Sequence, residues 1–218
     1  MRSIRVYRVR IKINPNGKVS SHHFRAYMIK KFPDSKLVEF SGGATIKIRS
    51  TPLIQYKILD SDPYIIAVED GVDALKEVLP ELSELYLGHH KYEIVEMEEK
   101  ESDSEIGVTT KRKKYMFETP WLALGEEDYG KFKYMYQKER DAALSKMLIR
   151  NILGLARTFN CEVDTRIRAS HDLKEIPPFK LGTSISGFVG SFELNFKIPE
   201  HLGIGNLSDR GFGSIIPK

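Results

Sequence analysis

Residues 203–214 (GIGNLSDRGFGS) form the stretch of the chain best suited to hold a phosphate group. Glycines permit positive φ angles and close approach of the backbone to a ligand. Exposed backbone N–H groups in such a loop can bind phosphate oxygens, and Arg210 would add a positive charge. The stretch is neither a nucleotide-hydrolase phosphate loop, which needs Gly-Lys-Ser/Thr, nor a dinucleotide fingerprint, which needs a following helix. The alternative is a turn that uses glycine for structural reasons. The four glycines concerned are Gly203, Gly205, Gly211 and Gly213.

Other cofactor chemistry finds little support in the residue counts. Cys161 is the single cysteine, which excludes an internal disulfide and a multi-cysteine metal site. The six histidines show no metal-ligand spacing, so we expect neither a metal nor a cofactor. No apolar run approaches the roughly 20 residues of a membrane span, and residues 1–5 lack the apolar core of a signal peptide. These features predict a cytoplasmic protein without a membrane partner.

The net charge of +4 conceals an uneven distribution along the 218 residues. Residues 1–60 carry 13 Lys+Arg and 3 Asp+Glu, whereas residues 61–110 carry 3 and 14. A strongly basic segment favours a polyanionic partner, because Lys and Arg release counterions when they bind phosphates. The alternative is that the basic and acidic segments fold against each other and cancel.

The first hundred residues alternate between strand and helix patterns. Residues 4–13 (IRVYRVRIKI) alternate with a period of two, with one side apolar and the other basic, which predicts a strand. Such a basic sheet face could follow RNA, or could pack beneath the acidic segment. A helix is expected from Ser20 or Ser21 to Phe32, with Phe24 and Met28 facing the core. The further expected elements are a hairpin over 37–49, strands over 53–60 and 63–68, a helix over 70–86 and a strand over 91–97.

Residues 98–105 (EEKESDSE) contain no apolar side chain and are expected to form a linker or an exposed loop. Beyond it we expect strands over 107–117, 161–169 and 183–198 and a long helix over 141–159. The element order predicts an α+β protein with two tandem ferredoxin-like βαββαβ domains, over residues 1–105 and 106–218.

Three motifs spread along the chain point to one family. They are the glycine-rich stretch Leu-Gly-Ile-Gly…Gly-Phe-Gly-Ser-Ile (202–215), PLIQYK (52–57) and TPWLAL (119–124). Together they resemble the CRISPR repeat-processing endoribonucleases of the repeat-associated mysterious protein superfamily, in particular the archaeal-type b subtype. The resemblance implies two ferredoxin-like domains and the binding of CRISPR repeat RNA. It also implies metal-free cleavage of one phosphodiester, leaving a 5′-hydroxyl and a 2′,3′-cyclic phosphate.

The chain departs from the subtype at the place of a catalytic histidine. The subtype has a histidine shortly before PLIQYK, where this chain has EFSGGAT (39–45). Other branches of the superfamily place a histidine in or near the first helix, which makes His22 and His23 the candidates here. At about 100° per residue, His23, Tyr27 and Lys30 share a stripe at the edge of the apolar face, whereas His22 faces solvent. We therefore expect His23 to act in preference to His22, with Tyr27 orienting its imidazole and Lys30 or Lys31 near the phosphate.

Two basic groups are candidate RNA contacts in the second half of the chain. Lys111, Arg112, Lys113 and Lys114 are consecutive, and Lys146, Arg150 and Arg157 share one stripe of the expected long helix. The simpler interpretation of that stripe is a solvated helix face.

The residues and the resemblance together predict a metal-independent CRISPR precursor-RNA endoribonuclease. One alternative is a catalytically inactive relative that holds repeat RNA or crRNA, which the absent histidine favours. The other is a protein whose glycine-rich loop serves subunit packing. Expected partners are the repeat RNA and other subunits of a CRISPR effector complex, and the protein is expected to be a monomer or homodimer.

Overall fold

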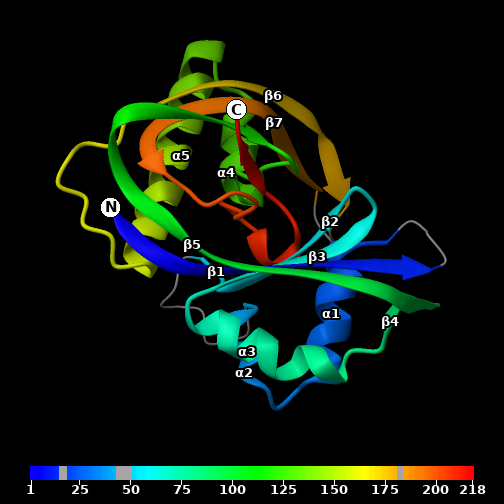
Figure 1. Ribbon diagram of the computed structural model, residues 1–218. Coiled ribbons are helices and arrows are strands. Elements are labelled where there is room, and N and C mark those ends of the chain that lie inside the picture. The colour runs from blue at the N-terminus through cyan, green and yellow to red at the C-terminus, as the bar shows by residue number, and fades with distance from the viewer. Residues whose placement is uncertain (15–18, 43–50, 181–183) are drawn as a thin grey trace. The chain divides into compact units, whose positions relative to one another are not determined.

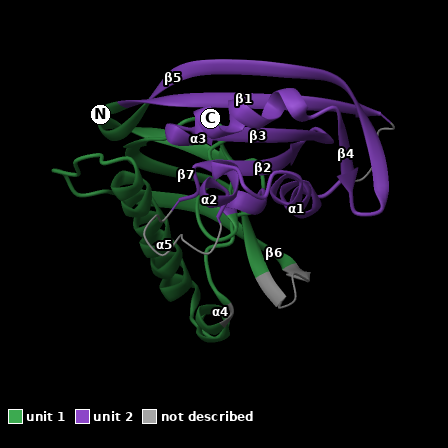
Figure 2. Ribbon diagram, turned by 90° about the horizontal axis from the view of Figure 1, so that it is seen from below, with its two compact units in different colours: residues 1–2, 105–207, 212–218 green, residues 3–104, 208–211 purple. Residues whose placement is uncertain are grey.

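The computed structural model describes residues 1–14, 19–42, 51–180 and 184–218. The chain forms two compact units (Figure 2). The N-terminal unit comprises residues 3–104 and 208–211, and the C-terminal unit comprises residues 1–2, 105–207 and 212–218. A short segment of the glycine-rich stretch therefore belongs to the N-terminal unit, although the residues on either side of it belong to the C-terminal unit.

The N-terminal unit has the ferredoxin-like order of elements. Its strands hydrogen-bond in the order β2-β3-β1-β5, with β4 pairing to β5, and β1 is antiparallel to β3 (Figure 1). This sheet order is that of a βαββαβ sandwich. The elements are β1 (Arg2–Asn14), α1 (Ser21–Lys31), α2 (Lys36–Phe40), β2 (Ile54–Leu59), β3 (Asp62–Val68), α3 (Asp70–Val78), the 3₁₀ helix η1 (Leu79–Glu81), β4 (Glu84–Leu87) and the first part of β5 (His90–Phe117).

The alternation of residues 4–13 determines which face of this sheet is covered. Tyr7, Val9 and Ile11 of β1 are buried in one core with Phe24 and Met28 of α1. Figure 1 shows α1, α2 and α3 on the same side of the strands. The predicted strand and the predicted helix with its two core residues are confirmed, and the position of α1 against the sheet follows from them.

The C-terminal unit is built on the last part of β5. The strand order is β5-β7-β6, and β8 pairs with residues 115–117 of β5. The elements are α4 (Glu126–Phe132), α5 (Gln137–Thr158), β6 (Ala169–Lys180), β7 (Ser184–Lys197) and β8 (Ile215–Pro217). The stretch between β7 and β8 carries one 3₁₀ helix, η2 (Ser208–Arg210), where a ferredoxin-like fold has its second helix. The fold is mixed, with ferredoxin-like units, as the sequence predicts.

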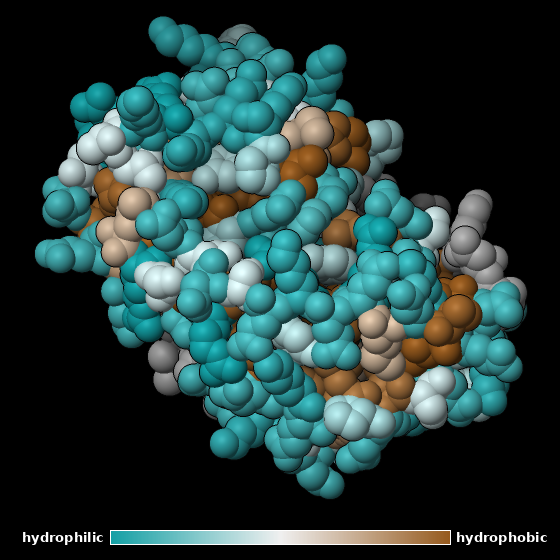
Figure 3. All heavy atoms as spheres, viewed as in Figure 1, coloured by the Kyte–Doolittle hydropathy of each residue, from teal (hydrophilic) through white to brown (hydrophobic). Residues whose placement is uncertain are grey.

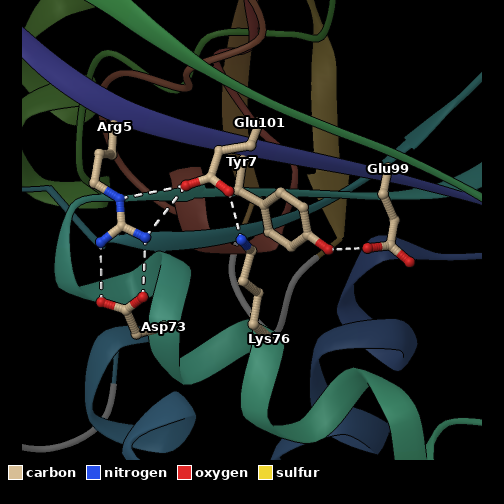
Figure 4. Close-up of polar contacts among 6 residues, drawn as sticks. All are labelled: Arg5, Tyr7, Asp73, Lys76, Glu99 and Glu101. Carbon is tan, nitrogen blue, oxygen red and sulfur yellow. Dashed lines mark hydrogen bonds and ion pairs between the residues drawn. The ribbon is translucent and has the colours of Figure 1, made fainter.

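The expected linker at 98–105 is wrong, because β5 continues through it as one strand of 28 residues. The acidic side chains of this segment are paired with bases that are distant in the sequence. Glu101 contacts Arg5 of β1 and Lys76 of α3, and the Tyr7 hydroxyl donates to Glu99 (Figure 4). A charge run without apolar residues can thus be a strand when neighbouring elements supply the opposite charges.

Three further boundaries differ from expectation. Residues 36–40 are helical rather than part of a hairpin, because the Ser35 side chain accepts a hydrogen bond from the Leu37 N–H and Leu37 is buried; residues 43–50 of the expected hairpin lie outside the described residues. The helix expected over 70–86 ends at Val78, and Pro80 falls in the 3₁₀ turn that follows. The strand expected over 161–169 is mostly irregular, since β6 begins at Ala169.

Hydrophilic side chains cover most of the face shown in Figure 3, and hydrophobic ones gather in smaller patches. No helix within the described ranges is both long and apolar enough to cross a membrane.

Candidate functional site

The TPWLAL motif and the glycine-rich stretch pack against each other in the C-terminal unit. Trp121 is fully buried, stacks on Phe117 and exchanges two backbone hydrogen bonds with Phe188. Gly205 has a φ of +87°, and a Cβ atom there would lie 2.5 Å from Trp121 Nε1. Any other residue at 205 would displace the indole, so this glycine is required by packing.

Most of the backbone donors in the glycine-rich stretch are already used. The N–H of Gly213 donates to Pro120, that of Asn206 to Leu122, and that of Ile204 to the carbonyl of Gly213. The N–H groups of Gly211, Phe212 and Ser214 also donate within the protein, and Gly203 forms a bridge with Ser214. The structural interpretation of the glycines therefore has direct support. The capacity to bind phosphate that we expected of the whole stretch falls chiefly on the side chain of Arg210.

Residues 208–211 contact the first turn of α1 in the N-terminal unit. The Ser21 hydroxyl donates a hydrogen bond to the carbonyl of Arg210. Gly211 has a φ of +90°, and a Cβ atom there would lie 2.6 Å from Ser21 Oγ. This close approach brings Arg210, from near the end of the chain, to the helix that begins at residue 21.

A buried ion pair holds this contact in place. Arg25 Nε lies 2.7 Å from Asp209 Oδ2, and both side chains are only 12 % exposed. The Arg25 guanidinium also donates to the carbonyl of Ser41 at 2.9 and 2.7 Å, and Ser41 Oγ lies 2.9 Å from the buried Tyr56 hydroxyl. Burial raises the pKa of Asp209, against the opposing effect of Arg25. The buried charges are therefore paired and hydrogen-bonded, as their desolvation requires.

His22 lies at the exposed edge of this network. Burial lowers the pKa of His22, and the positive charge of Arg210 lowers it further. The Arg210 side chain is 38 % exposed, with its Nε 3.7 Å from Asp209 Oδ2. The ring centroids of His22 and His23 are 5.9 Å apart. The structure therefore gathers two imidazoles and one accessible guanidinium at the start of α1.

His23 begins a stripe of α1 that faces β4. A Cβ atom at Gly88 would lie 3.4 Å from His23 Nδ1, and the Tyr27 hydroxyl donates to the carbonyl of Glu84 at 2.9 Å. One turn later, Lys31 Nζ donates to the carbonyl of Glu81 at 3.0 Å. His23 and Tyr27 share this face as predicted, but Lys31 takes the place expected for Lys30, and the Tyr27 hydroxyl donates to β4 and not to the His23 imidazole. Lys30 is exposed.

The predicted basic surfaces of the C-terminal unit are exposed. Lys111–Lys114 of β5 face solvent, with Arg112 donating to Ser170 Oγ at 3.1 Å. Arg112 also lines a cavity of about 530 Å³ with Arg168 and Asn195. Lys146, Arg150 and Arg157 of α5 are exposed.

The basic side chains of β1 form ion pairs with acidic residues. Arg10 pairs with Asp60 at 2.9 Å, and Lys12 pairs with Glu96 at 2.8 Å and Glu98 at 2.6 Å. Arg5 is held by Asp73 and Glu101 (Figure 4). Of the two interpretations of the basic strand, the one in which acidic segments neutralise it is therefore correct for these residues.

Sequence reasoning missed Arg25 and Asp209. An arginine in the helix and an aspartate in a loop carried no pattern that joined them. The signal that could have found them is the placement of Asp209 directly before Arg210 within a stretch whose glycines demand close packing.

The chain has two ferredoxin-like units with a glycine-rich connection before the last strand, which is the fold of the Cas6-related proteins. A Cas6-related protein from Pyrococcus furiosus has this fold, with a TM-score of 0.55 and 13 % identity over 99 % of this chain and 98 % of that one. Two solved structures are nearer: one of Cas6b (TM-score 0.89, 28 % identity) and one of a CRISPR RNA processing endoribonuclease Cas6b (TM-score 0.78, 26 % identity). Each covers 100 % of both chains.

The chain belongs to the Cas6b family. The model of the Cas6b N-terminal domain matches residues 2–105, and that of the Cas6b C-terminal domain matches residues 107–218. An uncharacterized protein of Methanocaldococcus jannaschii is 34 % identical over 143 residues, which are 64 % of this chain and 96 % of that one.

Proposed function

We propose that this protein is an endoribonuclease that processes CRISPR precursor RNA, binding the repeat and cleaving one phosphodiester without a metal ion. The observation that carries the proposal is that the Ser21 hydroxyl holds Arg210 at the start of α1, where its charge acts on His22 and where His22 lies beside His23. The Cas6b family, and the endoribonuclease named among its solved structures, supply the substrate class.

RNA carries its own nucleophile, so the site needs a base, an acid and a cation. A base removes the proton of the 2′-hydroxyl, whose oxygen attacks the adjacent phosphorus. An acid gives a proton to the departing 5′-oxygen. The products are a 2′,3′-cyclic phosphate and a 5′-hydroxyl. The entering and leaving oxygens lie on opposite sides of the phosphorus, so two neighbouring imidazoles can serve them, and a guanidinium stabilises the charge that develops between them.

The structure favours His22 as the base. Burial and then the charge of Arg210 lower the pKa of His22, which favours the neutral imidazole that a base requires. His23, which the helix geometry of the sequence favours over His22, is the second imidazole and the candidate acid. In this arrangement Tyr27 supports α1 against β4, and Lys30 and Lys31 add positive charge in the last turn of the same helix.

The test is cleavage of the repeat RNA from the protein's own genome, with EDTA present throughout. Wild type is expected to give a single cut with a cyclic phosphate on the upstream product. His22→Ala is expected to reduce the single-turnover rate by about 10²–10⁴-fold. His23→Ala is expected to reduce it by a similar factor, because it removes the candidate acid. His171→Ala, in the C-terminal unit, is the matched control. Wild-type rates for both His22→Ala and His23→Ala would refute this site.

A second candidate function is that of an RNA-binding relative without catalytic activity. The absence of a histidine before PLIQYK favours it, and the part of that segment from residue 43 to 50 lies outside the described residues. In that case wild type binds repeat RNA tightly in the same assay and leaves it intact. Other subunits of a CRISPR effector complex would then be its partners.

A further inference from the structure

The turn between α4 and α5 exposes two aromatic rings to solvent. Tyr134 is 80 % exposed and Tyr136 is 83 % exposed, and Met135 between them is 37 % exposed. The two tyrosines are the most exposed of the large hydrophobic side chains in the described residues. Apolar surface displayed in this way contributes nothing to the core and commonly marks an interaction site.

The turn that carries these rings is held rigidly by the protein. Consecutive backbone N–H groups of Lys133, Tyr134 and Met135 donate to the last turn of α4. The next N–H, that of Tyr136, donates to the Glu139 carboxylate at 2.9 Å, which caps α5. The rings are therefore presented on a fixed backbone, which lowers the entropic cost of binding.

Side chains on either side anchor the turn to the C-terminal unit. Phe132 is buried, and the Arg140 guanidinium lies 4.6 Å from its ring centroid. Arg140 also pairs with Glu175 at 2.7 Å, and the Tyr129 hydroxyl donates to the same carboxylate at 2.7 Å. Because the anchors precede and follow the turn, the exposure of Tyr134 and Tyr136 is a property of the fold.

Two lysines, Lys133 and Lys138, flank the rings in the sequence. Lys133 Nζ lies 4.9 Å from the centroid of the Tyr134 ring, and Lys138 follows in the first turn of α5. Within the part of the chain that the structure describes, neither lysine forms an ion pair, whereas Lys131 pairs with Glu127 at 3.7 Å and Glu139 is used in the cap. The exposed bases Lys146, Arg150 and Arg157 continue along α5, over about 30 Å of helix.

We propose that the α4–α5 turn is a stacking platform for single-stranded RNA, with bases stacked on Tyr134 and Tyr136 and phosphates bound by Lys133, Lys138 and the basic stripe of α5. Aromatic rings interleaved with basic side chains are the usual means of binding unpaired nucleic acid. A protein partner fits less well, because lysine is depleted from protein–protein interfaces. The inference deepens the proposed function and rests on RNA being the substrate.

The test compares three full-length proteins: wild type, the double variant Tyr134→Ala with Tyr136→Ala, and the double variant Tyr134→Phe with Tyr136→Phe. The probes are the repeat RNA and an oligouridine of about 15 nucleotides. The Ala variant is expected to bind both probes about tenfold more weakly or worse. The Phe variant keeps both rings and is expected to retain wild-type affinity.

Wild-type affinity of the Ala variant for both probes would overturn the platform, and so would a loss equal in the Ala and Phe variants. A change from dimer to monomer in the Ala variant, with RNA affinity intact, would assign the turn to self-association instead. If wild type neither binds nor cleaves the repeat, the proposed function fails. Binding of the oligouridine then tests the stacking platform separately, since the platform requires that this binding still depend on the two rings.

Discussion

One set of basic residues in each unit differs from the other in how it is used. In the N-terminal unit, Arg5, Arg10, Lys12 and Arg25 are all engaged by carboxylates, although residues 1–60 have the larger excess of positive charge. In the C-terminal unit, Lys111–Lys114 and the basic stripe of α5 are exposed to solvent. Among the described residues, a place in the most basic segment of the sequence therefore does not show that a basic side chain is accessible.

The physical reason is that an excess of charge in one segment is matched by the opposite charge in another. The acidic residues of β5 lie against the bases of β1 and α3 (Figure 4). A basic residue that is already paired within the protein must give up its carboxylate before it can neutralise a phosphate and release counterions from the RNA. A basic residue is available to bind RNA when folding leaves it without an acidic partner. Neither the net charge nor the position of the residue in the chain reveals this.

The largest effect is expected from breaking the buried pair of the N-terminal unit. Asp209→Ala leaves the Arg25 guanidinium buried without its carboxylate, so we expect the free energy of unfolding to fall by about 3–5 kcal/mol. Urea denaturation measures this change. Glu96→Ala, which removes one carboxylate from the exposed Lys12, is the matched control and should leave the midpoint near that of wild type. Equal midpoints for the two variants would show that burial of the pair has no energetic weight.

The next effect concerns Arg210, a partly exposed basic residue that the N-terminal unit holds at the start of α1. Arg210→Gln is expected to reduce repeat cleavage by about 10²-fold, because it removes the cation at the phosphorane. It also removes one of the positive charges that lower the pKa of His22, so this pKa rises toward its ordinary value of 6.5. More of the imidazole is then protonated at a given acidic pH, and the acid limb of kcat/KM moves to higher pH.

The control for this prediction is Arg210→Lys, which keeps the charge. It should leave the acid limb close to that of wild type even if the rate falls. A lower rate for Arg210→Gln with an unmoved acid limb would contradict the assignment of His22 as the base, and would limit Arg210 to a role in binding or folding.

Local patterns determined much of this fold. The period of two in β1 and the spacing of Phe24 and Met28 specified the element types and the faces that they bury. Residues 98–105 could not be assigned correctly, because their charges are satisfied by Arg5 and Lys76 from other elements. Helix or strand preference is local, whereas the partner of a charged side chain is a property of the tertiary structure.

The candidate site, like the fold, was predictable from the sequence only in part. His22 and His23 were identifiable from their position at the start of a helix. The pairing of Arg25 with Asp209 was not, because it depends on residues 208–211 reaching α1. The contact of residues 208–211 with α1 also favours His22 as the base, although the helix geometry alone placed His22 on the solvent face.

A smaller effect, on the salt dependence of RNA binding, is expected from the exposed basic residues of α5. Lys146→Gln combined with Arg150→Gln should make the dependence of log Kobs on log salt shallower by about 1.4, since each single-strand phosphate contact contributes about 0.7. The measurement is repeat-RNA affinity over a range of salt concentrations. An unchanged slope would remove this face of α5 from the RNA footprint.

The smallest effect is expected from an equal loss of charge in β1. Arg10→Gln combined with Lys12→Gln also removes two positive charges, yet these bases are already neutralised by Asp60, Glu96 and Glu98. Binding a phosphate would require them to give up these carboxylates, so we expect them to release no counterions from the RNA, and the slope of the same salt titration should equal that of wild type. A slope reduced as much as in the α5 variant would mean that RNA displaces these carboxylates. Pairing within the fold would then no longer distinguish the two units, and the charge excess of residues 1–60 would be the better guide to the RNA-binding surface.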